Sequence, residues 1–355
     1  MRLFIFLTAL FALTGNLLAQ LSNVNSFIDS YVKQHNFNGT ILIQKNSKIN
    51  YQKSFGFANL QFNIPNRTET KYKIASITKL FTSVLILQLY EQGKIDLNKT
   101  IKTYLPDYTG EGADKVTIHQ LLNHTSGMVN IDTITSFESV LKNGIPVYQK
   151  PSTTDELLIK YSSDTLVNEP GKVFSYNNAD YIILGKIIER ISNKTYEQAL
   201  KENILQQLKM QNSGLLYQHD IIKGLADTYY FRDDLKKLVN DLPVYIENWY
   251  AAGAMYSTTN DLLKFSNALF GLKLLKKETL SMMVQPGLDD YGYSVWIGKW
   301  EINNKKHIAI KRPGRIMGAQ GMLLHFLNED LTIIILSNTG TTDLDEFVFE
   351  IIKRI

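Results

Sequence analysis

Ser76 and Lys79 stand three residues apart in the stretch KIASITKL, residues 73–80. On a helix, side chains at i and i+3 lie on the same face, so a hydroxyl and an amine at this spacing can share one pocket. A neutral lysine amine can take a proton from a serine hydroxyl and make it a nucleophile. The same spacing occurs at two more places in the chain: Ser30 with Lys33, and Ser139 with Lys142. The spacing alone therefore does not identify a catalytic pair, and the residues around Ser76 have to be considered.

The segment after Ser76 predicts a buried helix. From Ile77 the chain reads ITKLFTSVLILQLYEQG, which is apolar around much of a helix, and Gly93 supplies a left-handed stop. Ser76 then lies at a helix N-terminus, beside unpaired backbone N–H groups and the positive end of the helix dipole. Lys79 either reaches outward to solvent or is held in a poorly solvated place, where desolvation lowers its pKa from about 10.4. In the simplest alternative, Ser76 only caps the helix.

Strand patterns occur toward both ends of the chain, and helical patterns occur in its middle. Two β-rich stretches predict a hairpin around the polar turn at residues 46–48: 40–44 and 49–60. Four later stretches predict a meander of antiparallel strands: 291–302, 307–312, 321–327 and 331–338. Apolar residues at i, i+3 and i+4 predict helices between them: 155–161, 180–191, 196–208 and 234–239. Further helices are expected at the two ends of the mature chain: 21–34 and 344–355.

These elements predict an α+β architecture with one antiparallel sheet. The first and last thirds of the chain, about 20–115 and 245–355, combine into a sheet lobe covered by the terminal helices. The segment of about 116–244 is expected to form an inserted, all-helical lobe. A ligand cleft would lie where the two lobes meet.

Composition indicates a soluble, exported protein. The chain has 355 residues, 44% hydrophobic and 20% charged, as in ordinary globular proteins. Residues 1–19 place one arginine before a short apolar run and end on a small residue, which predicts a secretory signal peptide cleaved before Gln20. The alternative is a retained membrane anchor, although the run is shorter than the ~20 apolar residues of a membrane span. The chain has no cysteine and therefore cannot form a disulfide framework. An exported protein without cysteine suits a bacterial periplasm or medium.

Several classes of partner find no support in the sequence. The net charge is only +4, and the basic residues are scattered, so no nucleic-acid partner is expected. No phosphate-binding loop or dinucleotide fingerprint occurs, and we expect no metal or organic cofactor. His124 and Ser126 in NHTSG would invite a catalytic-triad interpretation, but no Gly-x-Ser-x-Gly elbow is present. The six histidines are dispersed without the spacing of a metal site: His35, His119, His124, His219, His307 and His325.

The order of these motifs resembles the serine beta-lactamases and penicillin-binding proteins, especially the class C type branch with its esterases and D-amino-acid peptidases. The likeness runs through nearly all of the mature chain. It rests on five ordered blocks: 55–108, VTIHQLLNHTSGM (116–128), VFSYNNADYIILGKIIERIS (173–192), AAGAMYSTTNDLLKFSNAL (251–269) and IKRPGRIMGAQGMLLHF (310–326). The resemblance implies a beta-lactamase/transpeptidase-like fold.

By that resemblance, Ser76 is the acylated nucleophile and Lys79 its proton-transfer partner. Tyr176 and Asn178 match the Tyr-x-Asn element of the family. A phenol beside an amine can relay a proton to the leaving group, and a carboxamide can bind the lysine and a substrate amide. The alternative interpretation of the string YNN is a simple helix cap. Tyr291 has a family counterpart near the site.

The third motif departs from the family, which has Lys or His, any residue, then Gly. The matching residues here are Arg312, Pro313 and Gly314. Arginine cannot shuttle a proton, but it can bind a substrate carboxylate or lower the pKa of Lys79 and Tyr176. In a third interpretation it is a solvated edge charge. Gly314 would let the substrate approach closely, and the N–H of Arg315 would join that of Ser76 in an oxyanion hole by analogy with the family.

The resemblance implies an exported serine hydrolase that forms an acyl-enzyme on an amide, ester or beta-lactam carbonyl. Its substrate would be a small molecule or peptide, including peptidoglycan-derived ones, and a membrane would be a partner only if the signal segment is retained. The competing hypothesis is a non-catalytic penicillin- or peptidoglycan-binding module with the same fold. The changed third motif motivates it, and the intact set of Ser76, Lys79, Tyr176 and Asn178 argues against it.

Overall fold

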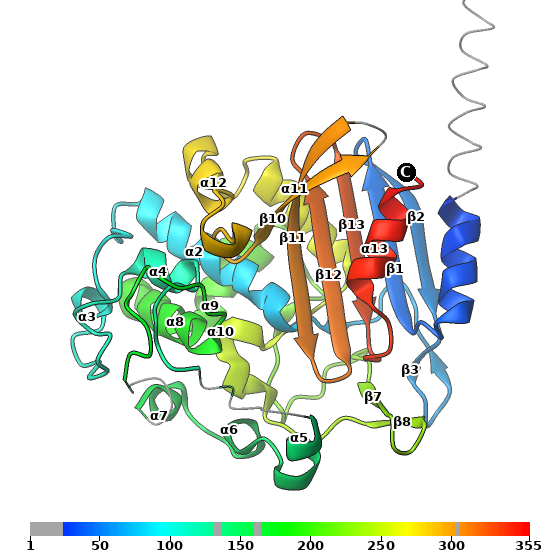
Figure 1. The fold of residues 1–355 in the computed structure, drawn as a ribbon, viewed down its shortest axis with the longest axis horizontal. Coiled ribbons are helices and arrows are strands. Elements are labelled where there is room, and N and C mark those ends of the chain that lie inside the picture. The colour runs from blue at the N-terminus through cyan, green and yellow to red at the C-terminus, as the bar shows by residue number, and fades with distance from the viewer. Residues whose placement is uncertain (1–23, 131, 133–136, 160–164, 303–304) are drawn as a thin grey trace, which may run out of the picture.

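A six-stranded antiparallel sheet forms the centre of the protein (Figure 1). The computed structural model describes residues 24–130, 132, 137–159, 165–302 and 305–355. The expected signal segment, 1–19, lies outside the described residues. In spatial order the strands are β10 (Trp296–Ile302), β11 (Lys305–Ile316), β12 (Ala319–Phe326), β13 (Leu331–Ser337), β1 (Gly39–Lys45) and β2 (Lys48–Phe55).

The central strands of this sheet are buried on both faces. Every residue of β12 and β13 is buried, which explains their nearly continuous apolar sequences, GMLLHF and LTIIIL. Register is fixed along the pairs, with Met322 opposite Ile335 and Ile41 opposite the same Ile335 from the other side. The sheet therefore needs a layer of helices on each face.

The outer face is covered by the two ends of the chain, helix 24–34 and α13 (Leu344–Ile352) (Figure 1). The ring of Tyr31 stacks on that of Phe347 with centroids 4.1 Å apart, so the two helices also contact each other. Asp343 caps α13 by accepting hydrogen bonds from two backbone N–H groups of its first turn.

The inner face packs against α11 (Thr259–Phe270), which contacts β13 and β1, and beside α11 lies α2 (Thr78–Glu91) (Figure 1). Eleven of its fourteen residues are buried, as its apolar sequence predicts, and Gly93 ends it at a φ of 70°. The remaining α-helices of the described residues are α3 (Ile101–Tyr104), α4 (Ile118–Leu122), α5 (Phe137–Asn143), α6 (Pro146–Gln149), α7 (Thr154–Leu157), α8 (Asn178–Ser192), α9 (Tyr196–Leu200), α10 (Tyr250–Gly253) and α12 (Lys277–Met283).

The architecture confirms the predicted hairpin and meander, with a break in the hairpin and a first meander strand that begins at Trp296 and not at residue 291. Gly56, at a φ of 66°, interrupts the second strand of the hairpin, and β3 (Phe57–Asn59) continues beyond it to pair with β4 (Ile64–Pro65). The predicted helices at 180–191 and 344–355 correspond to α8 and α13. In the described part of the pattern at 155–161, α7 is followed by π-helical residues at 158–159, and residues 160–161 lie outside the described residues.

The predicted helix at 234–239 is wrong. These residues form the turn and second strand of a hairpin between β7 (Tyr229–Arg232) and β8 (Lys237–Asn240). Lys236 has a φ of 50°, which a helix cannot accommodate, and Arg232 pairs with Asp234 across the turn.

The inserted segment is consequently not all helical. It also contributes β6 (Gly214–Leu215) to a small sheet with β5 (Tyr72–Lys73) and β9 (Met255–Ser257). Within the described parts of the chain, no helix combines the length and apolar character needed to cross a membrane.

Candidate active site

Ser76 lies on a tight turn between the sheet and α2. It occupies the middle of a 3₁₀ turn, Ala75–Ile77, and neither this turn nor α2 is capped by a side chain. The capping interpretation of Ser76 is therefore wrong. Ala75 adopts a φ of 48°, a conformation that L-residues rarely take. The Thr78 hydroxyl donates a hydrogen bond of 2.7 Å to the Ala75 carbonyl and helps to hold this turn.

Lys79 is fully buried beside Ser76. Its Nζ lies 3.3 Å from Ser76 Oγ, and it donates to Asn178 Oδ1 at 2.5 Å and to the Ala252 carbonyl at 2.9 Å. Burial lowers the pKa of Lys79 because it penalises the charged amine, and the nearby Arg312 lowers it further, while Tyr176 opposes the shift. The amine can therefore lose its proton at a lower pH than a solvated lysine does. A lysine that accepts the Ser76 proton has to be neutral.

Tyr176 places its phenol in the same cluster. Its hydroxyl accepts a hydrogen bond of 2.7 Å from Arg312 Nη2, and Lys79 Nζ lies 4.9 Å from the centroid of its ring. Burial raises the pKa of this phenol, but the charges of Arg312 and Lys79 and hydrogen bonds to Lys79 and Ser76 outweigh it and lower the pKa to about 8. A phenol with this pKa can give and take a proton near neutrality.

Arg312 is fully buried and holds the cluster together, so it is not a solvated edge charge. Its Nε donates to the Ser76 carbonyl at 2.7 Å. Its Nη1 donates to Tyr291 Oη at 2.9 Å and to the Ser294 carbonyl at 3.0 Å. Since Nη2 donates to the Tyr176 hydroxyl, each nitrogen of the guanidinium donates a hydrogen bond to the protein. The structure therefore favours the prediction that Arg312 acts on the pKa of Tyr176, and it leaves no free fork for a bidentate carboxylate pair.

Gly314 allows strand β11 to approach the turn that carries Ser76. A Cβ on this glycine would lie 2.3 Å from the Ile74 carbonyl oxygen and 3.2 Å from the Ser76 backbone nitrogen. This glycine therefore lets β11 pack closely against the turn that carries Ser76, and its expected contact with a substrate stays a prediction. Arg315 follows on the strand, and its exposed side chain lines a groove of about 880 Å³ with Tyr230 and Met317.

Asp132 joins the site through Asn178 and was not predicted from the sequence. Asn178 Nδ2 donates to Asp132 Oδ2 at 2.5 Å, and the Tyr148 hydroxyl donates to Oδ1. Tyr148 itself is fixed by stacking on Trp249, with centroids 3.5 Å apart. Asp132 belongs to a polar stretch without periodicity, so only its position in space connects it with Ser76.

His124 holds the segment that carries Tyr176, a role that the sequence also did not reveal. The His124 carbonyl accepts a hydrogen bond from Ser175 N at 2.8 Å, and its Nδ1 accepts one from Asn177 N at 3.3 Å. The centroid of its ring lies 4.3 Å from that of the Tyr176 ring. His124 thus contacts Tyr176 and both of its chain neighbours, Ser175 and Asn177.

The histidine ring is in turn fixed by a buried carboxyl group. His124 Nδ1 lies 2.8 Å from Asp180 Oδ2, and both side chains are inaccessible. Burial lowers the pKa of His124 well below its usual range and raises the pKa of Asp180 well above its own. Both shifts oppose an ion pair between the imidazole and the carboxyl group.

A family model described as beta-lactamase matches residues 24–350. The chain belongs to the beta-lactamase family. It is 28% identical over 281 residues to the putative penicillin-binding protein PbpX of Bacillus subtilis, an alignment that covers 79% of this chain and 67% of that protein. It is 26% identical to the teichoic acid D-alanine hydrolase of Staphylococcus aureus, covering 75% of this chain and 61% of that enzyme.

Solved structures confirm the predicted fold of this beta-lactamase family member. A penicillin-binding protein from Bacillus halodurans superposes with a TM-score of 0.77 at 26% identity, covering 91% of this chain and 97% of that one. The sheet flanked by terminal helices and an inserted, mostly helical segment is thus the beta-lactamase/transpeptidase-like arrangement.

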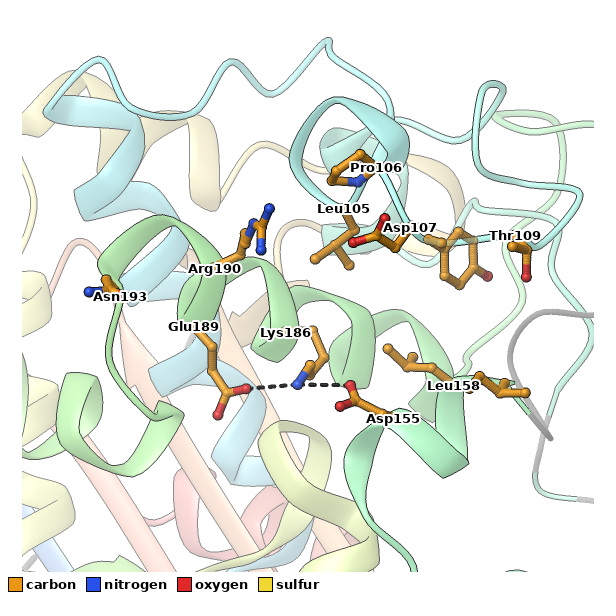
Figure 2. Close-up of a pocket in the computed structure, with 12 residues that line it drawn as sticks. Leu105, Pro106, Asp107, Thr109, Asp155, Leu158, Lys186, Glu189, Arg190 and Asn193 are labelled. Carbon is orange, nitrogen blue, oxygen red and sulfur yellow. Dashed lines mark ion pairs between the residues drawn. The ribbon is translucent and has the colours of Figure 1, made fainter.

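Another cavity of the protein, of about 520 Å³, lies among the helices away from Ser76 (Figure 2). Figure 2 shows Lys186 of α8 between two carboxylates, Asp155 at 2.9 Å and Glu189 at 3.1 Å. This lysine is already paired on both sides, and no residue of the Ser76 cluster lines the cavity. This cavity is therefore separate from the Ser76 cluster.

Proposed function

We propose that the protein is an exported serine hydrolase that acts through an acyl-enzyme on Ser76. The observation that carries this proposal is the buried amine of Lys79, 3.3 Å from Ser76 Oγ and in one hydrogen-bonded cluster with Tyr176 and Asn178. The substrate carbonyl would belong to an amide, an ester or a beta-lactam. The name of the Staphylococcus relative supports a D-alanyl group on the acyl side.

Acylation would begin when Lys79 or Tyr176 takes the proton from Ser76 Oγ. The oxygen then forms a bond to the carbonyl carbon, and the carbonyl electron pair moves to its oxygen. Backbone N–H groups of Ser76 and Arg315 would stabilise this oxyanion. The bond to the leaving group breaks as the Tyr176 phenol gives it a proton, and an ester on Ser76 remains. Where Lys79 took the serine proton, Lys79 passes that proton to the Tyr176 oxygen, so both groups end in their starting states.

Deacylation would use the same groups in reverse order. A water molecule gives a proton to the base and attacks the ester carbonyl, and Ser76 Oγ recovers its proton as it leaves. The acid product and free enzyme result. Arg312 would take no proton in either step, because its role is to hold Tyr176 and the Ser76 carbonyl. This chemistry requires no metal or organic cofactor.

Export is supported by the signal-like segment at residues 1–19 and by the cell-wall names of the relatives. A periplasmic or secreted enzyme would meet small-molecule or peptidoglycan-derived substrates in the cleft between the sheet lobe and the inserted lobe. N-terminal sequencing of exported protein tests this point, since a chain that starts at Gln20 is the expected product.

The rival function is a module that binds penicillin or peptidoglycan without turnover. Incubation with a fluorescent penicillin or a fluorophosphonate, followed by intact mass spectrometry, separates the two. A covalent adduct that is absent from Ser76→Ala supports the hydrolase. Reversible binding without an adduct supports the module.

A further inference from the structure

Strand β11 contacts the Ser76 turn near its C-terminal end. Arg312 Nε donates to the Ser76 carbonyl at 2.7 Å, and a Cβ on Gly314 would lie 3.2 Å from the Ser76 backbone nitrogen. Beyond Arg315, the strand ends in a two-residue turn, 317–318, that leads into β12. Because the Arg315 N–H is expected to bind the oxyanion, whatever fixes this turn also fixes that group.

The carboxylate of Asp241 fixes the turn between β11 and β12. The Gly318 N–H donates to both of its oxygens, at 3.0 Å to Oδ1 and 3.3 Å to Oδ2. Gly318 is buried, and a Cβ at this position would lie 2.0 Å from the Tyr229 carbonyl oxygen, so the turn packs directly on β7. Without the carboxylate, a buried N–H would lose its acceptor.

The same part of the chain also holds the segment before Ser76. Asp241 and Thr228 directly flank the hairpin of β7 and β8, and the Asp241 N–H donates to the Thr228 carbonyl at 3.1 Å. Thr228 Oγ1 accepts a hydrogen bond of 3.2 Å from Lys73 Nζ. Lys73 is the last residue of β5 and lies three positions before Ser76. The base of the hairpin, Thr228 and Asp241, therefore connects β5 with the end of β11.

Lys73 and Asp241 also interact through their charges. Burial lowers the pKa of Lys73, and the carboxylates of Asp241 and Asp227 oppose this shift. Burial raises the pKa of Asp241, and a hydrogen bond to Thr228 and the charge of Lys73 oppose it. Each charge thus favours the ionised form of the other. The carboxylate that accepts from Gly318 is in this way supported by the cation on β5.

We propose that Asp241 is a positioning residue for the reaction at Ser76, because it keeps β11 aligned with the Ser76 turn and so orients Arg312 and the Arg315 N–H. This inference rests on the proposed function and adds a residue to it. Asp241 exchanges no proton with the substrate in this role. Its loss should misplace groups that act in the transition state, and it should leave the initial binding of a reagent nearly unchanged.

The test measures the limiting rate and the half-saturating concentration of fluorophosphonate labelling of Ser76. Asp241→Ala removes the acceptor of the Gly318 N–H, and Asp241→Asn keeps an oxygen for it. Glu91→Ala is the matched control, because the Glu91 carboxylate also accepts from a backbone N–H of a distant segment, that of Lys276 at 2.7 Å, but at the end of α2 far from Ser76. Thermal unfolding shows which variants are folded at the assay temperature.

Asp241→Ala is expected to lower the limiting rate by about 10- to 100-fold, the scale of a misplaced catalytic group. Its half-saturating concentration should stay within about threefold of the wild type. Asp241→Asn should recover the limiting rate to within about threefold of the wild type, because the hydrogen bond to Gly318 is kept. Glu91→Ala should behave as the wild type in both quantities.

A wild-type limiting rate in Asp241→Ala would overturn the inference. Equal losses in Asp241→Ala and Asp241→Asn, or a comparable loss in Glu91→Ala, would do the same. If Asp241→Ala is not folded, Asp241→Glu takes its place, because it keeps the charge and displaces the carboxylate by one methylene group. A limiting rate within about threefold of the wild type in that variant overturns the inference, and a larger loss supports it.

Absence of labelling in the wild type would refute the proposed function and would not by itself decide the role of Asp241. Hydrogen exchange measured by mass spectrometry then decides, on peptides that cover 72–80 and 312–322 in the wild type and in the folded Asp241 variant. Exchange that is faster by about tenfold or more in both peptides supports the positioning role. A smaller change in the peptide that contains Ser76 overturns it.

Discussion

Replacing Arg312 with glutamine should raise the pKa of the base that activates Ser76. Arg312 lowers the pKa of Tyr176 through its charge and its 2.7 Å hydrogen bond, and it also lowers the pKa of Lys79. Whichever of the two groups takes the serine proton, the loss of this charge moves its pKa upward. The fully buried position of Arg312 means that solvent does not screen the effect.

The size of the effect follows from the pKa of Tyr176, which is about 8 in place of 10.0. Two pKa units correspond to about 2.7 kcal/mol of differential interaction. At pH 7 about one phenol in ten is ionised at a pKa of 8, and about one in a thousand at a pKa of 10. Lys79 and Ser76 contribute to the same net shift, so the loss of Arg312 removes only part of it. Arg312→Gln should therefore slow acylation at pH 7 by about 10- to 100-fold and recover part of the rate as the pH approaches 10.

The assay is the second-order rate of fluorophosphonate labelling of Ser76 as a function of pH. The wild type should show a limb that rises through a pKa near 8, and Arg312→Gln should move this limb to higher pH. Arg312→Lys restores the charge and should restore part of the shift. Lys311→Gln is the matched control, because Lys311 is the neighbouring cation but pairs with Asp345 on the surface. A limb that stays near pH 8 in Arg312→Gln would refute the reasoning.

Three further predictions concern the support of the site and the stability of the fold. His124→Asn should lower kcat by about 10- to 100-fold with KM within a few-fold of the wild type, because Tyr176 loses its fixed position; an unchanged kcat would argue against this role. Gly314→Ala should cost about 1–3 kcal/mol of unfolding free energy in a denaturant titration, because its Cβ meets the Ile74 carbonyl at 2.3 Å; a stability equal to the wild type would contradict the close contact. Burial lowers the pKa of His325 to about 4, so between about pH 6.5 and about pH 4 the unfolded state binds more protons than the folded state. The free energy of unfolding should therefore fall by up to about 3 kcal/mol as the pH drops from about 6.5 to about 4. Thermal unfolding against pH should show a weaker acid dependence in His325→Gln, and an equal dependence would exclude this histidine as the cause.

The sequence was sufficient to predict the buried helix that carries Lys79 beside Ser76 and the sheet that supports it. Strong apolar runs specify β12, β13 and α2, because these elements are buried on nearly all sides. The burial of α2 then forces Lys79 into a poorly solvated place, and the structure confirms this. The grouping of Tyr176 and Asn178 with Ser76 came from resemblance, since no periodicity links residues a hundred positions apart.

The features that the sequence did not reveal depend on tertiary contacts. Asp132 and His124 lie in loops, where no repeating pattern indicates the direction of a side chain. The segment 234–239 has apolar residues at helical spacing, but a left-handed Lys236 turns it into a hairpin. The orientation of Arg312 is set by acceptors on three separate segments, at residues 76, 176 and 291–294.

The most direct test of the account is peptide mapping of the fluorophosphonate adduct in the wild type and in Lys79→Met. The account predicts one adduct per chain, on the peptide that contains Ser76, and labelling slower by several orders of magnitude when the buried amine is replaced by an isosteric thioether. An adduct on another residue, or equally fast labelling of Ser76 in Lys79→Met, would contradict the claim that Lys79 activates this serine.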